Sequence, residues 1–169
     1  MLYSEKAAAI EKTSALINFA AALGIAVIVP LFHNQLATGP IINALFFIAV
    51  IVLGAEKALF ISLIPSVIAL SAGLLPIIFA PMIPFIMIGN AILILTFNSL
   101  KDKNYWIGVV LSSFLKFIFI YSSSFIVINL IVKKELASNI SSMMSWPQLL
   151  TALMGGVLAY FFLKIIKKV

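Results

Sequence analysis

The sequence predicts an all-α integral membrane protein, a bundle of six transmembrane helices that forms one domain. Of the 169 residues, 64% are hydrophobic and only 9% are charged, whereas a soluble domain carries about 25% charged residues. A soluble fold of this size could not bury so much apolar surface, so the excess must face lipid or neighbouring helices. Apolar stretches also recur along the whole chain, which indicates that membrane lipid surrounds most of the protein.

Six apolar stretches approach the length of about 20 residues that an α-helix needs to cross a bilayer. The predicted helices cover residues 14–32, 41–54, 58–72, 82–100, 105–132 and 147–166. Pro147 suits the first turn of the last helix. The N-terminal segment mixes acidic and basic residues and lacks a clear cleavage site, so we expect the first helix to be retained and not removed as a signal peptide.

The second and third predicted helices are short, and the third contains Pro65. The charged pair Glu56 and Lys57 between them predicts a turn at a water interface. The alternative is a four-helix topology in which these two stretches form one re-entrant hairpin, buried among the other helices.

The lysines predict the orientation of the bundle, because cytoplasmic loops carry an excess of basic residues. A cytoplasmic N-terminus followed by six spans places eight lysines inside and two, Lys133 and Lys134, outside. Both termini are therefore expected in the cytoplasm. The eight inside lysines are Lys6, Lys12, Lys57, Lys101, Lys103, Lys164, Lys167 and Lys168.

Lys116 is a charged residue within the predicted fifth helix. It lies about 16 Å from the start of that helix, at 1.5 Å per residue, where a charge costs at least about 2.5–3.5 kcal/mol. We therefore expect it to face the bundle interior or a water-filled cavity, with Ser112, Ser113 and Ser123 on a related face. Two roles remain open: contact with an anionic or carbonyl group of a ligand, or a structural lysine that snorkels towards the cytoplasmic interface.

Asn90 lies about 12 Å deep in the predicted fourth helix. Because the fourth and fifth helices are consecutive and antiparallel, Asn90 and Lys116 reach similar depths from opposite ends and could converge on one site. Gly89 permits close approach by a helix or a ligand. The alternative role for Asn90 is an interhelical hydrogen bond, worth roughly 0.6 kcal/mol in a membrane protein.

A polar stretch, HNQLATGPIIN, joins the first two predicted helices. Gln35, Thr38 and Asn43 cluster there at the predicted outer mouth, where they could cap a cavity and donate hydrogen bonds. The alternative is a solvated turn in which Thr38-Gly39-Pro40 starts the second helix. His33 in the same stretch does not by itself indicate a metal site.

Small residues repeat at four-residue spacing in the first and last predicted helices. The first helix has Ala22 and Ala26, and the last has Ala152, Gly156 and Gly155, Ala159. This spacing lets helices approach closely in lipid. From physics alone, packing within the chain is favoured over contact with a partner.

Several function classes lack the residues that they need. The chain has no cysteine and one histidine, which excludes Cys-ligated centres and a multi-His metal site within one chain. Glu56, Asp102 and Glu135 fall in connections, so there is no paired-carboxylate site, and there is no phosphate-binding loop. The sequence therefore predicts no enzyme activity, no metal and no cofactor.

The six-helix layout, the Ala22–Ala26 pair and the stretches HNQLATGPIINAL and PMIPFIMIGNAIL resemble the substrate-binding S components of energy-coupling-factor transporters. The resemblance covers nearly the whole chain in layout, and its motifs are short. It implies a multi-pass protein of a prokaryotic plasma membrane that binds a vitamin-like small organic micronutrient from the outer side. It also implies a transmembrane coupling subunit and two cytoplasmic ATPase subunits as partners.

The resemblance further implies roles for individual residues. Ala22 and Ala26 would contact the coupling subunit. Metal-transporting members begin with a Met-His-type segment, whereas this chain begins Met1-Leu2-Tyr3, which favours an organic ligand over nickel or cobalt. The implied ligand-binding residues are Gln35, Thr38, Asn43, Asn90, Lys116 and Asn129.

Two other function classes remain open. The chain could be a non-catalytic structural subunit of a membrane enzyme complex, or a small secondary carrier acting as a homodimer. The lack of a carboxylate within the predicted spans makes proton coupling less natural for a carrier.

Overall fold

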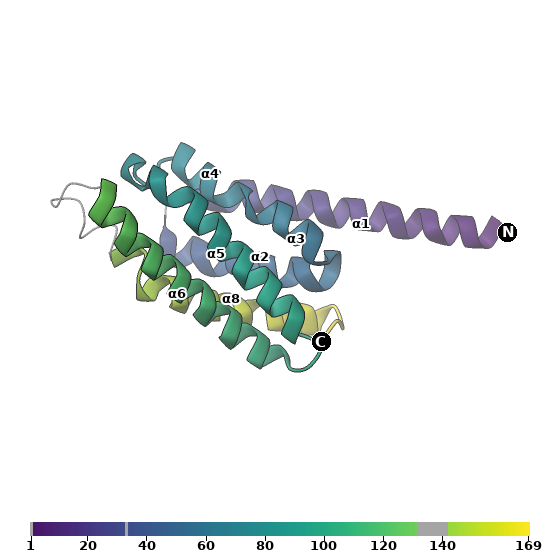
Figure 1. Ribbon diagram of the computed structural model, residues 1–169. Coiled ribbons are helices and arrows are strands. Elements are labelled where there is room, and N and C mark those ends of the chain that lie inside the picture. Colours follow the sequence, from purple (N-terminus) through teal and green to yellow (C-terminus); the bar gives the residue numbers. More distant parts are fainter. Residues whose placement is uncertain (1, 33, 132–141) are drawn as a thin grey trace.

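The computed structural model describes residues 2–32, 34–131 and 142–169, and within them every regular element is a helix. The helices run along one bundle axis, and the N-terminal part of α1 extends beyond the bundle (Figure 1). The elements are α1 (Leu2–Ile28), η1 (Val29–Phe32), α2 (Gln35–Leu53), α3 (Ala55–Ser62), α4 (Ile64–Ser71), η2 (Ile77–Met82), α5 (Ile83–Leu100), α6 (Tyr105–Ile131) and α8 (Trp146–Ile165).

Five segments of the described chain are long and apolar enough to cross a membrane. They correspond to five of the six predicted helices, so the all-helical fold and these five candidate spans are confirmed. The predicted third helix, 58–72, is instead divided into α3 and α4, which have eight residues each. The five segments are Lys12–Phe32, Gln35–Leu53, Phe79–Leu100, Tyr105–Asn129 and Trp146–Ile165.

The division between α3 and α4 lies at Leu63 and follows from Pro65 in the first turn of α4. Proline has no N–H to donate along the helix, and its ring clashes with the carbonyl four residues earlier. It is tolerated in a first turn, where the N–H has no helical partner. The turn before α3 lies at Gly54, whose φ of 88° suits glycine, so Glu56 and Lys57 belong to α3 and not to the turn that we predicted.

Helix α2 begins six residues earlier than predicted, at Gln35 instead of residue 41. The Asn34 side chain accepts hydrogen bonds from the backbone N–H groups of Leu36 and Ala37, at 3.1 and 3.2 Å, and so caps the helix. The predicted polar loop over 33–40 is therefore wrong from Gln35 onward. The consequence is that Gln35, Thr38 and Asn43 project from one helix.

Helix α8 packs closely on α2 through glycine. A Cβ on Gly155 would lie 2.6 Å from Asn43 Cβ and 2.9 Å from the Pro40 carbonyl oxygen. On the neighbouring side, Tyr105 Oη of α6 donates a hydrogen bond to the Gly156 carbonyl oxygen at 2.7 Å. The small residues of the last helix thus pack within the chain.

The two ends of the bundle differ. One end, here the lysine end, contains the Gly54 turn, the turn at 101–104 and the C-terminus (Figure 1). The opposite end, here the pocket end, contains η1, the start of α2, the end of α4 and η2. Lysines at the lysine end are Lys57, Lys101, Lys103, Lys164, Lys167 and Lys168.

Candidate functional site

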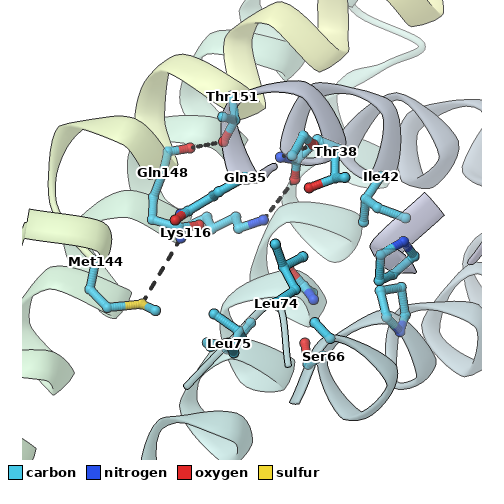
Figure 2. A pocket seen from close by; sticks show the side chains of 17 residues that line it. Gln35, Thr38, Ile42, Ser66, Leu74, Leu75, Lys116, Met144, Gln148 and Thr151 are labelled. Atoms are coloured by element: carbon cyan, nitrogen blue, oxygen red, sulfur yellow. Dashed lines mark hydrogen bonds between the residues drawn. The ribbon is translucent and has the colours of Figure 1, made fainter. Parts of the chain in front are cut away.

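A cavity of about 100 Å³ lies between the helices and extends towards the pocket end. Its walls come from η1, α2, α4, the segment after α4, α5, α6 and α8. The apolar walls include Ile42, Leu74 and Leu75 (Figure 2). The polar residues that line it are Gln35, Thr38, Asn43, Ser66, Asn90, Lys116, Gln148 and Thr151.

Five of the six predicted ligand-binding residues line this cavity: Gln35, Thr38, Asn43, Asn90 and Lys116. They come from three helices, α2, α5 and α6. The expected convergence of the fourth and fifth predicted helices on one site is therefore observed in the geometry.

Among the described residues of the cavity wall, Lys116 is the charged one. Its side chain is 3% exposed, and Nζ donates a hydrogen bond to Asn43 Oδ1 at 2.7 Å (Figure 2). Asn43 Nδ2 in turn donates to the Gly39 carbonyl oxygen at 2.9 Å, which points Oδ1 towards the lysine. Nζ also lies 6.0 Å from the centroid of the Phe46 ring, a separation at the limit for cation–π attraction.

Asn90 lies beside the break between α3 and α4. Its Nδ2 donates to the Ser62 carbonyl oxygen over 3.4 Å, which is longer than the usual range for such a bond. The neighbouring Gly89 faces α6, where an added Cβ would lie 2.7 Å from Ile120 Cγ1 and 3.7 Å from Lys116 Cγ. Gly89 therefore brings α5 against the stem of Lys116.

Two glutamines form hydrogen bonds at the side of the cavity nearest the pocket end. Gln35 Nε2 and Gln148 Nε2 both donate to the Met143 carbonyl oxygen, at 3.2 and 3.3 Å. Thr151 Oγ1 donates to the Gln148 carbonyl oxygen at 3.2 Å. These bonds join the start of α2 to the start of α8.

Sequence reasoning missed Ser66, Gln148 and Thr151. Ser66 follows Pro65 at the start of α4, where the helix break turns it into the cavity wall. Gln148 and Thr151 are three residues apart and so share one helix face, a signal that could have identified them as a pair.

Other predicted residues lie elsewhere. Asn129 is exposed, donates from Nδ2 to the Phe125 carbonyl oxygen at 2.8 Å and does not line the cavity. Ser112 and Ser123 donate to backbone carbonyls of their own helix, and Ser113 Oγ is buried without a hydrogen-bond partner. None of these serines lines the cavity. His33, Lys133, Lys134 and Glu135 fall outside the described residues.

Ala22 and Ala26 are 7% and 0% exposed and belong to the same apolar core as α2 and α8. Ala22 also borders a second, apolar groove of about 610 Å³ between α1, α2 and α8. In this conformation the two alanines pack within the chain.

The described residues contain no group of three or more His, Cys, Asp and Glu side chains that could hold a metal ion. Comparison of the chain with protein-family models, curated proteins and solved structures finds no match.

Proposed function

We propose that the chain is the substrate-binding membrane subunit of an ATP-driven importer of the energy-coupling-factor type, a non-enzymatic protein that binds a vitamin-like small organic micronutrient. The observation that carries this proposal is the cavity itself. Polar side chains from α2, α4, α5, α6 and α8 meet there, within helices that are otherwise apolar. Polar groups inside a membrane bundle are costly and typically mark ligand or ion pathways.

The proposed topology has six passes, of which α3 and α4 together form the third. Their 17 residues, 55–71, span about 25 Å at 1.5 Å per residue, slightly less than the hydrocarbon thickness of about 30 Å. The lysine end faces the cytoplasm by the positive-inside rule, with both termini there. The pocket end then faces outward in the plasma membrane of a prokaryote.

In the proposed mechanism the chain binds and positions the ligand, and other subunits supply the energy. Lys116 and Asn43 form the floor of the site, and Asn90 contacts the ligand from α5. Gln35 and Thr38 contact it from α2, nearer the pocket end. A coupling subunit and two ATPases complete the importer.

The contact with the coupling subunit involves α1 in this proposal. Ala22 and Ala26 are buried against the rest of the chain. A coupling subunit must therefore dock beside Ala22, which borders the apolar groove, or displace α1 from α2 to reach Ala26.

Native mass spectrometry of gently solubilised complexes tests the proposal. We expect a small organic molecule bound to the chain and co-purification of one further membrane subunit and two ATPases. Asn90→Ala should lower the fraction of the protein that carries the bound molecule and keep the partners, whereas the exposed Asn129→Ala should keep both. A chain that carries no small molecule and no ATPase from native membranes would contradict the proposal.

A further inference from the structure

We infer that the ligand of this cavity is a small monocarboxylate with an apolar body, and that its carboxylate is the missing counter-ion of Lys116. The inference rests on the proposed binding function and names the chemical class of the ligand.

The first step is charge. Lys116 is 3% exposed, and no Asp or Glu is among the described residues that line the cavity. The described acidic side chains, Glu56 and Asp102, lie at the lysine end, and Asp102 is paired with Lys101 at 2.9 Å. A buried ammonium without an anion is strongly unfavourable, so an anionic ligand gains more here than a neutral one.

The second step is hydrogen-bonding capacity. A lysine ammonium has three N–H donors, and the side-chain hydrogen bond found for Lys116 among the described residues uses one of them, towards the neutral Asn43. The remaining donors are available for the two oxygens of a carboxylate. Asn90 Nδ2 has a bond of 3.4 Å to Ser62, so it can turn to the same ligand at little cost.

The third step is shape. Lys116 and Asn90 lie on the central parts of α6 and α5, whereas Leu74, Leu75 and Met144 come from the segments after α4 and before α8, nearer the pocket end. A ligand that places its carboxylate on Lys116 therefore places its other end against these apolar side chains. Gln35 and Gln148 lie at the same side, where both amide nitrogens already donate to the Met143 carbonyl oxygen.

The fourth step is size. The cavity of about 100 Å³ is smaller than an engineered apolar cavity of about 150 Å³ that binds benzene. A short-chain acid fits this volume better than a single-ring acid or a larger micronutrient does. An inorganic polyanion is disfavoured, because one lysine and apolar walls cannot match its several charges.

The test uses matched acids and amides as probes: butyrate against butyramide, and benzoate against benzamide. Each pair has nearly the same shape and differs in charge. Purified full-length protein in detergent is heated with each probe at equal concentration and neutral pH, and unfolding is followed by tryptophan fluorescence. We expect at least one acid to raise the unfolding temperature and its amide to leave it unchanged.

Two substitutions separate charge from shape. Lys116→Met removes the charge and keeps an unbranched side chain that is one atom shorter, so the affinity for the acids should fall roughly tenfold to a hundredfold. Asn43→Asp puts an internal carboxylate 2.7 Å from Nζ, where Oδ1 now lies. It should abolish the response to acids. Asn129→Asp adds the same charge at an exposed site and should leave the response intact.

The outcomes distinguish the carboxylate inference from the proposed binding function. Equal responses to an acid and its amide, no response of the unsubstituted protein to either acid, or a full response in Asn43→Asp would overturn the carboxylate inference. If native mass spectrometry then finds a neutral bound molecule, the proposed binding function stands without it. If it finds neither a molecule nor partners, the proposed function itself fails.

Discussion

The half of the bundle at the lysine end and the half at the pocket end are built on different principles. The lysine half is filled by large side chains: Phe97 is fully buried, with its ring centroid 4.7 Å from that of Phe47 and 5.5 Å from that of Tyr105. The pocket half is interrupted by Pro65, the short η2 and a polar cavity. The pocket half also has an apolar core, in which Phe79, Met82 and Ile120 are fully buried. The two halves therefore differ in the helix breaks and the polar cavity, which only the pocket half combines with its core.

At the boundary between the two halves, the same residues affect both the stability of the bundle and ligand binding. Asn43 contacts Lys116 through its side chain, and Gly155 of α8 packs against its Cβ position. The close α2–α8 contact therefore fixes the position of the group that holds the lysine. We expect substitutions of the packed side chains in the lysine half to affect mainly stability. Substitutions at the boundary should affect both stability and binding, and substitutions of the polar cavity residues in the pocket half should affect mainly binding.

The largest loss of stability is expected from Phe97→Ala. Lipid already offers an apolar environment, so the packing and cavity terms dominate, and we expect at least about 2 kcal/mol. This corresponds to a fall of about 4–8 °C in the unfolding temperature, measured by tryptophan fluorescence in detergent. The control is Phe125→Ala on α6, because Phe125 is 67% exposed and should shift the temperature little. Equal shifts would show that the burial of Phe97 does not stabilise the bundle.

Gly155→Ala is expected to have the next largest effect. The new Cβ would lie 2.8 Å from the Ala44 backbone nitrogen and 2.9 Å from the Pro40 carbonyl oxygen, so α8 must move away from α2. Overpacking of this kind costs about 1–3 kcal/mol, and the displaced Asn43 should also weaken ligand binding. The matched control is Gly24→Ala, since a Cβ there meets nothing within 4 Å. If Gly155→Ala is as stable as the unsubstituted protein and binds the ligand equally well, the close α2–α8 contact determines neither stability nor the position of Asn43.

Tyr105→Phe should cost less. It removes the hydrogen bond of 2.7 Å to the Gly156 carbonyl oxygen and keeps the ring, so the expected loss is about 1 kcal/mol. Tyr121→Phe serves as the control, because Tyr121 is 49% exposed on the same helix. The difference between the two unfolding temperatures measures the bond. If the two unfolding temperatures do not differ, the aromatic rings alone, and not the hydrogen bond, stabilise this end of the bundle.

Much of this arrangement could be predicted from the sequence. Hydropathy and length identified five candidate spans, because an apolar helix of about 20 residues needs no tertiary information. The start of α2 was missed because Thr38-Gly39-Pro40 resembles a turn, whereas capping by Asn34 outweighs it. The break at Leu63 was missed although Pro65 was recognised within the predicted third helix.

Five of the residues that line the cavity were predicted from the sequence, but the contacts between them were not. Lys116 and Asn43 are 73 residues apart, and spacing along the chain says nothing about which distant helices touch. Asn129 does not line the cavity, and helix geometry could have indicated this: at 3.6 residues per turn it lies about 220° around α6 from Lys116, on a different face. Its exposure in the structure agrees with that geometry.

Asn90→Ala is expected to have the smallest effect on stability and a clear effect on binding. The bond of 3.4 Å to Ser62 is weak, and membrane hydrogen bonds average roughly 0.6 kcal/mol, so the unfolding temperature without ligand should change by no more than about 2 °C. Loss of a ligand contact should weaken affinity by about tenfold, measured by titration of the bound molecule. Asn129→Ala should change neither quantity. A large fall in the unfolding temperature of Asn90→Ala with unchanged affinity would show that Asn90 stabilises the packing and does not contact the ligand. The part of α5 around Asn90 would then belong to the lysine half and not to the binding site.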